Sequence, residues 1–110
     1  MSMHEAQSVT TAAFRALLAG EKPVLAGFTA EWSAPCRTMT PVLDLLADGF
    51  YGAAEVVTLD LDAEPLLAAE LRIASLPTLL VFVGGEERER MVGLREYDDV
   101  EKKLLKYIKE

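Results

Sequence analysis

Cysteine is almost absent from this chain of 110 residues, since Cys36 is the only one. One cysteine cannot close an intramolecular disulfide, so the fold does not depend on one, and a reducing cytoplasm is the expected compartment. Histidine is equally scarce, with only His4 near the start. No histidine or cysteine partner accompanies it, so the sequence predicts no metal site, and a serine hydrolase would have only this remote base.

Basic residues are also few. Lys and Arg number 11 against 18 Asp and Glu, and the formal net charge is −7. Because the basic residues are scattered, nucleic acid and anionic membranes are not expected as partners. No apolar run is long enough to span a bilayer, and the polar start does not resemble an export signal. With 51% hydrophobic residues, the chain is predicted to form one globular domain over residues 1–110, with residues 1–8 as a loose tail.

Hydrophobic periodicity predicts helices that alternate with strands. Buried strands joined by helices imply right-handed crossovers onto a parallel sheet, and a hairpin late in the chain adds antiparallel strands. The predicted fold class is therefore α/β, with a central mixed sheet and helices on both faces. Helices are predicted over 11–19, over 34–50 with a kink at Pro41, after a cap at Asp62, and over 97–108; strands are predicted over 24–28, 56–61, 78–83 and 87–92.

Residues 29–41, Thr-Ala-Glu-Trp-Ser-Ala-Pro-Cys-Arg-Thr-Met-Thr-Pro, lie where a buried strand leads into a helix. The free N–H groups of a first helical turn favour anions, including a thiolate. Cys36 is therefore either a slow reactive thiol or an inert, packed residue. Ser33 is predicted to cap the helix rather than to act as a nucleophile. Asp44 and Asp48, four residues apart, are interpreted as a solvated helix face.

The order of elements, taken with two motifs, resembles the thioredoxin family from about Ser8 onward. The motifs are Trp32-Ser33-Ala34-Pro35-Cys36-Arg37 and Leu76-Pro77-Thr78, and the further landmarks are Phe28, Ala30-Glu31, Pro41, Asp62, Gly84-Gly85 and Gly93. The resemblance implies a thioredoxin-like fold and reduction of protein disulfides without a cofactor. The implied partners are protein thiols or disulfides and a thioredoxin reductase.

In that family the motif is Trp-Cys-x-Pro-Cys, in which the first, exposed cysteine attacks a substrate disulfide and the second resolves the mixed disulfide. The resemblance therefore places Ser33 at the attacking position and Cys36 at the resolving position. The implied substrate-binding residues are Trp32, Ala34, Pro35, Leu76, Pro77 and Gly93. The Leu76–Pro77 bond is expected to be cis, and Pro77 is expected to face the motif and leave adjacent backbone free to pair with an extended substrate.

The chain departs from this pattern where the chemistry is expected. A serine hydroxyl stays protonated near neutral pH unless a base activates it, so the two-thiol cycle cannot run with Ser33. The family's buried acid aligns with Gly27, and Thr29 replaces a common aromatic residue. Ser33 is either an engineered replacement or the native residue of a divergent member. The corresponding functions are a redox-crippled oxidoreductase and a redox-silent module that binds an extended peptide or partner protein.

Overall fold

A computed structural model describes residues 3–109 and shows a five-stranded mixed sheet with four helices. The strand order is β1-β3-β2-β4-β5, in which β3 runs parallel to both β1 and β2, and β4 runs antiparallel to both β2 and β5. The elements are β1 (Gln7–Ser8), α1 (Thr11–Leu18), β2 (Val24–Thr29), α2 (Ala34–Gly49), β3 (Glu55–Asp60), α3 (Pro65–Glu70), β4 (Thr78–Val83), β5 (Glu86–Val92) and α4 (Tyr97–Leu105). The predicted α/β class and mixed sheet are confirmed.

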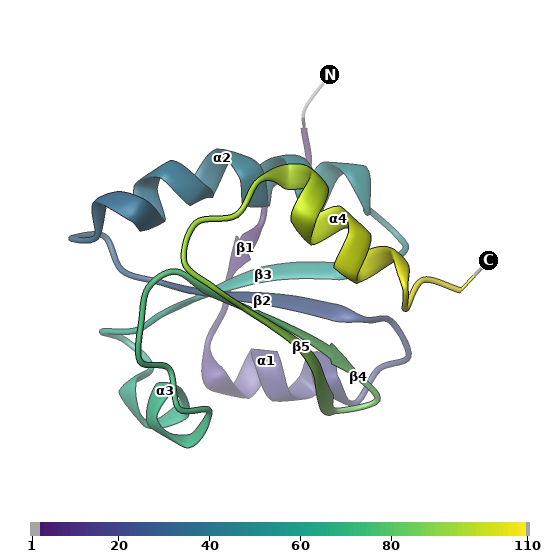
Figure 1. Cartoon of the computed structure of the whole chain (residues 1–110). Helices are drawn as coiled ribbons and strands as arrows, with labels where there is room; N and C mark the ends of the chain where they lie inside the picture. The colour runs from purple at the N-terminus through teal and green to yellow at the C-terminus, as the bar shows by residue number, and fades with distance from the viewer. Residues whose placement is uncertain (1–2, 110) are drawn as a thin grey trace.

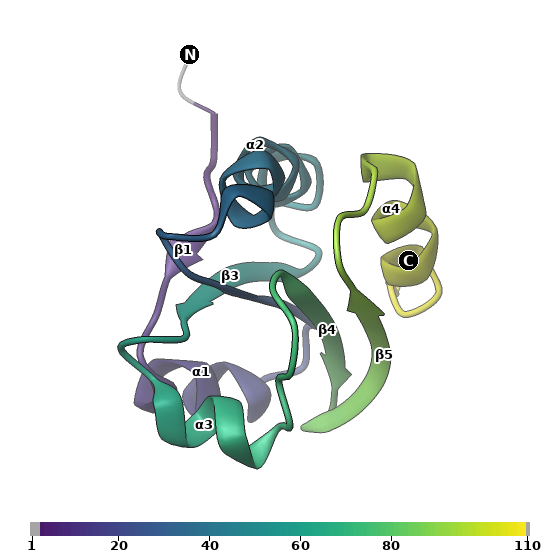
Figure 2. The ribbon, with the colours of Figure 1, turned by 60° about the vertical axis from the view of Figure 1, so that its left-hand side comes forward.

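The helices cover the sheet in pairs, with α2 and α4 on one face and α1 and α3 on the other (Figures 1 and 2). Successive side chains of a strand point to opposite faces. Accordingly, Leu25 packs with Leu43 of α2 and Leu104 of α4, whereas its neighbour Ala26 packs with Phe14 of α1. Because both faces are covered, β2 is apolar and buried from Val24 to Phe28, as the sequence predicted. No helix within residues 3–109 is long and apolar enough to cross a membrane.

The predicted loose tail is wrong for the part that the structure describes. Gln7–Ser8 forms the edge strand β1, which pairs with β3. The carboxylate of Asp44 accepts a hydrogen bond from the N–H of Ala6, and that of Asp48 accepts one from the N–H of His4. These two carboxylates therefore hold the N-terminal segment on α2 rather than only facing solvent. Residues 1 and 2 lie outside the described residues.

The predicted cap of α3 is also wrong. The helix starts after Glu64, and its cap has no side-chain hydrogen bond. The Glu64 carboxylate instead reaches the start of α1, where Thr11 donates to it from its backbone N–H and from its hydroxyl at 2.7 and 2.8 Å. A carboxylate satisfies free N–H groups at a helix start and is favoured there by the dipole. Glu64 therefore joins α1 to α3, and Asp62 is free for another contact.

Arg72, just beyond α3, has a φ of 57°, a left-handed conformation that non-glycine residues adopt at a cost of roughly 1–2 kcal/mol. We expect Arg72→Gly to raise the free energy of unfolding by about 1 kcal/mol, because glycine removes the steric cost. Urea denaturation would measure the change. Arg72→Ala is the matched control, since it removes the same side chain but keeps the Cβ, and equal stability of the two variants would contradict the prediction.

Candidate functional site

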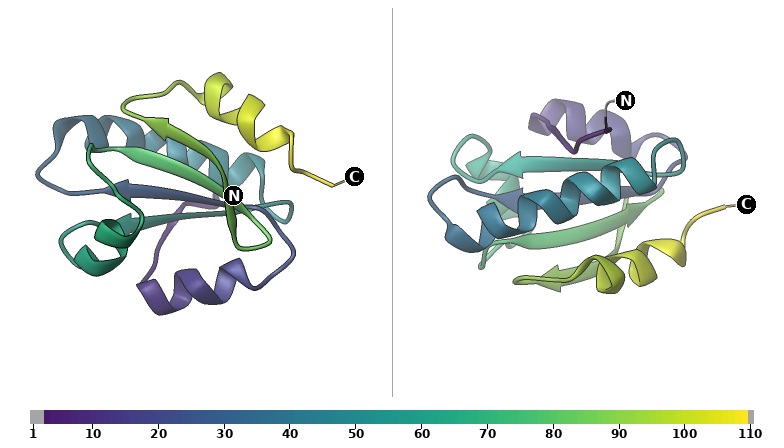
Figure 3. Two further views of the ribbon diagram at one scale, coloured as in Figure 1. Left: turned by 60° about the horizontal axis from the view of Figure 1, so that its bottom comes forward. Right: turned by 90° about the horizontal axis from the view of Figure 1, so that it is seen from above.

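The register of the sheet brings three chain segments to one end of the molecule. Phe28 of β2 pairs with Thr78 of β4, and Thr78 pairs in turn with Val92 of β5. The segment after β2, the segment before β4 and the segment after β5 therefore leave the sheet at the same end. Figure 3 shows that α2 also begins there and runs across the sheet with α4 beside it. The predicted site residues lie on these three segments.

Ser33 is the N-cap of α2, as the sequence predicted. Its backbone is extended, and its hydroxyl accepts a hydrogen bond from the N–H of Cys36. The N···O distance of 3.4 Å exceeds the usual range of about 2.7–3.2 Å, so the bond is weak. Ser33 is only 6% exposed, whereas the resemblance implied an exposed residue at the attacking position. The hydroxyl is thus directed at the helix start and largely shielded from water.

Cys36 lies in the first turn of α2, with Ala34 and Pro35 exposed before it. The cysteine is only 2% exposed. Its carbonyl accepts a hydrogen bond from the hydroxyl of Thr40 at 3.1 Å. The thiol is therefore shielded from water and from reagents in solution. In this structure Cys36 is a packed thiol.

Gly27 lies in β2, and the position of a Cβ built on it would face α2. That Cβ would stand 3.1 Å from Cδ2 of Leu79 and 3.2 Å from Cδ1 of Leu43. Both leucines are fully buried in the core between the sheet and α2. Thus two apolar side chains occupy the space into which any side chain at position 27 would extend.

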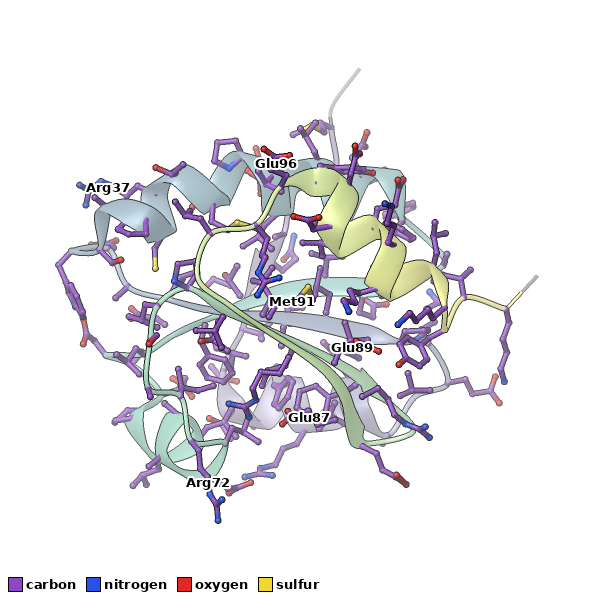
Figure 4. All side chains as sticks on the ribbon, in the orientation of Figure 1. Arg37, Arg72, Glu87, Glu89, Met91 and Glu96 are labelled. Atoms are coloured by element: carbon purple, nitrogen blue, oxygen red, sulfur yellow. The ribbon has the colours of Figure 1, made fainter. Side chains whose placement is uncertain are left out.

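Trp32 is 65% exposed. Its indole N–H donates to the Asp62 carboxylate at 2.9 Å, which fixes one edge of the ring and leaves a large surface open to solvent. Asp62, which the sequence analysis interpreted as a helix cap, is therefore a partner of Trp32. The next charged residue, Arg37, extends away from the body of the protein at the start of α2 (Figure 4) and donates to the carbonyl of Glu31 at 2.7 Å.

Pro77 precedes β4, and the Leu76–Pro77 peptide bond is cis. The carbonyl of Pro77 accepts a hydrogen bond from the N–H of Gly93 at 2.8 Å, and the hydroxyl of Thr78 donates to the carbonyl of Ser75 at 2.6 Å. The backbone N–H and C=O of Leu76 make no hydrogen bond within residues 3–109. These two backbone groups of Leu76, beside Pro77, are therefore free to pair with a bound segment.

Exposed Leu94, which directly follows Gly93, was missed by sequence reasoning. An apolar residue after a glycine gives no signal of its own, because only the register shows that it lies at the same end as Trp32. The only histidine is elsewhere: the ring of His4 stacks on that of Tyr51, with centroids 3.5 Å apart, beyond the far end of α2. No imidazole base stands beside Ser33, so the site offers one shielded hydroxyl, one buried thiol and an exposed aromatic surface.

Comparison with known proteins gives a consistent result. The sequence model of the family described as Thioredoxin matches residues 5–106. A thioredoxin from Porphyra purpurea is 38% identical over 101 residues, covering 91% of this chain and 94% of that protein. A bifunctional thioredoxin reductase/thioredoxin from Mycobacterium leprae is 39% identical over 100 residues, covering 84% of this chain and 22% of that protein. The solved structure of a mutant thioredoxin from Halobacterium salinarum NRC-1 has a TM-score of 0.88 and 30% identity, and the match covers 100% of this chain and 96% of that one.

Proposed function

Since the chain belongs to the thioredoxin family, we propose that it is a thiol–disulfide oxidoreductase whose attacking position holds Ser33. The observation that carries this proposal is the arrangement around the start of α2. Ser33 caps the helix directly over Cys36, and cis-Pro77 and Gly93 lie at the same end of the sheet. The site keeps the arrangement for disulfide exchange and lacks one sulfur atom.

The substrate in this proposal is a protein disulfide within an extended segment. Among the residues that the structure describes, the backbone N–H and C=O of Leu76 have no partner, which suits a peptide that adds to the chain in the manner of a strand. Trp32 and Leu94 supply exposed apolar surface at the same end of the sheet. The reductant would be a thioredoxin reductase, consistent with the name of the Mycobacterium leprae relative, and the compartment would be the cytoplasm.

The test places a thiol at the attacking position. Ser33→Cys is assayed for reduction of insulin with dithiothreitol as donor, against the parent chain. Activity above the parent supports the proposal. Equal rates for the two proteins contradict it, provided that the variant carries both thiols in reduced form by thiol titration.

A second function is favoured by the surroundings of Gly27. A Cβ at this position would stand only 3.2 Å from Leu43 and 3.1 Å from Leu79, so both leucines would have to shift to admit the acid that the family uses to assist proton transfer at the resolving cysteine. A chain that lacks both the attacking thiol and this acid is suited to a redox-silent module, which holds a peptide at Trp32 and Pro77 without exchanging disulfides.

For this second function, we expect Trp32→Ala to weaken binding of a cysteine-free extended peptide, selected for binding to the parent chain, by about tenfold. Loss of a large buried aromatic contact at an interface typically costs 1 kcal/mol or more. Isothermal titration calorimetry measures the dissociation constants. Tyr51→Ala is the matched control, since Tyr51 is equally exposed but lies beyond the other end of α2. If every peptide tested binds only when the protein retains Cys36, the redox-silent module is ruled out.

A further inference from the structure

Arg90 of β5 connects the hairpin to the end of α3. Its Nε and one terminal nitrogen each donate to one oxygen of the Glu87 carboxylate at 2.9 Å. The remaining contacts go to main chain: Nη2 donates to the carbonyl of Leu71 at 2.7 Å, and Nη1 donates to that of Arg72 at 3.2 Å. Figure 4 shows Glu87 on β5 and Arg72 after α3 on the same side of the sheet. One planar guanidinium therefore joins two chain segments through four hydrogen bonds.

These contacts are directed at a turn that needs external support. The last carbonyls of a helix have no partner within the helix and carry partial negative charge, so a cation is favourable beside them. Here the turn also contains Arg72 in the left-handed conformation. A bidentate pair with a carboxylate fixes the guanidinium plane more rigidly than a single contact would. Consistent with this geometry, the hydrogen bond with Arg90 lowers the pKa of the Glu87 carboxyl and raises that of Arg90.

The supported turn leads directly to the candidate peptide site. Only residues 73–76 separate Arg72 from Pro77. At the far end, the segment is held by the bond from Thr78 to Ser75 and by that from Gly93 to Pro77. Between these anchors, the backbone N–H and C=O of Leu76 have no partner within residues 3–109. Hence the placement of these two backbone groups depends on the anchor at each end.

We propose that Arg90 is a positioning residue, which holds the segment of residues 72–77 in the conformation that presents Leu76 and Pro77 to a peptide substrate. This inference rests on the proposed function, because positioning of the segment affects activity only if a peptide binds there. The hydrogen-bond geometry itself does not depend on the function.

The experiment compares Arg90→Met with Arg88→Met. Arg88 is an exposed arginine two residues earlier on β5, and its side chain makes no hydrogen bond or ion pair within residues 3–109. The first readout is hydrogen exchange of the backbone amides of Ile73 and Gly93, which donate to Ala68 and Pro77 at the two ends of the segment. We expect about tenfold faster exchange at both in Arg90→Met, because local opening raises exchange without global unfolding. The amide of Leu25 in the central strand reports any global loss of stability.

The second readout uses the Ser33→Cys background. Arg90→Met should raise KM for insulin several-fold and leave the rate with a small aromatic disulfide unchanged, because only the protein substrate needs the positioned segment. Arg90→Lys, which keeps the charge but not the planar fork, should resemble Arg90→Met and serves as the test if the methionine variant does not fold.

The outcomes separate the two proposals. Unchanged exchange at Ile73 and Gly93 overturns the positioning role, and so does faster exchange with an unchanged KM for insulin. Faster exchange at Leu25 by the same factor shows a purely structural role and also overturns it. If Ser33→Cys is itself inactive, the proposed function has failed, and exchange at the two amides alone then decides whether Arg90 positions the segment.

Discussion

Ser33→Cys should give the chain disulfide reductase activity, with a rate on insulin on the order of tenfold or more above the parent in dithiothreitol at pH 7. The thiolate is the attacking species, and an ordinary cysteine with a pKa of about 8.5 is already a few per cent ionised at pH 7. The start of α2 should lower this pKa further, since the N-cap side chain faces a free N–H group of the first turn. A serine hydroxyl supplies no comparable nucleophile.

The two cysteines of the variant and the thiol donor account for every step of the reaction. The new thiolate attacks one substrate sulfur, and the other substrate sulfur leaves as a thiolate. The Cys36 thiolate then attacks the sulfur at position 33, which releases the second substrate thiol and leaves a disulfide between positions 33 and 36. Two thiols of dithiothreitol reduce that disulfide and become oxidised in turn.

Two controls define the result. Ser33→Ala keeps the packing near Cys36 but offers neither oxygen nor sulfur, so it should match the parent. The variant with Ser33→Cys and Cys36→Ser should form a mixed disulfide with the substrate but should not resolve it. Rapid turnover by this last variant would show that Cys36 does not act as the resolving residue.

Local sequence signals predicted most of the fold. Ser33 caps α2 as expected, because a side chain that bonds to an N–H three residues later depends only on local sequence. The apolar runs predicted the buried strands β2, β3 and β4, since helices cover both faces of the sheet. The position of Pro77 before β4 likewise followed from sequence order.

The contacts that sequence reasoning missed are between residues far apart in the chain. Asp62 bonds to Trp32 from 30 residues away, and Glu64 bonds to Thr11 from 53 residues away. Aspartate before a helix is a good local cap, so the prediction for Asp62 was reasonable, but its carboxylate bonds to Trp32 instead. The two-residue strand β1 has too few residues for any alternation to show. Arg90 bonds to the carboxylate of Glu87, which is three residues away in the sequence. Its other two contacts are to carbonyls 18 and 19 residues away, which local sequence cannot predict.

Gly27→Asp should be among the most destabilising single changes in this protein, with a loss of roughly 3–5 kcal/mol in the free energy of unfolding at pH 7. The Cβ alone would approach Leu43 and Leu79 to 3.2 and 3.1 Å, which requires both side chains to shift. The carboxyl group would then enter a core lined by leucine side chains. A buried carboxylate without a partner is more costly than the steric contact.

The steric and electrostatic parts can be separated. Gly27→Ala adds only the Cβ and should cost about 1 kcal/mol or less, because alanine also reduces the entropy of the unfolded chain. For Gly27→Asp, burial should raise the carboxyl pKa of the folded state above its unfolded value of about 3.9. The deficit relative to Gly27→Ala should therefore grow as pH rises above about 4 and the unfolded chain ionises. Urea denaturation of both variants and the parent at pH 5 and pH 8 measures this difference.

The result distinguishes between the two proposed functions. A large, pH-dependent loss means that Leu43 and Leu79 do not make room for a carboxylate at position 27. That result would agree with a redox-silent binding module, which needs no acid there. A small loss without pH dependence would mean that Leu43 and Leu79 move aside and that water or a partner reaches the carboxylate. In that case the Ser33→Cys variant should gain further activity from Gly27→Asp, because a carboxylate at the position of the family's buried acid can accept the Cys36 proton as the thiol attacks the mixed disulfide.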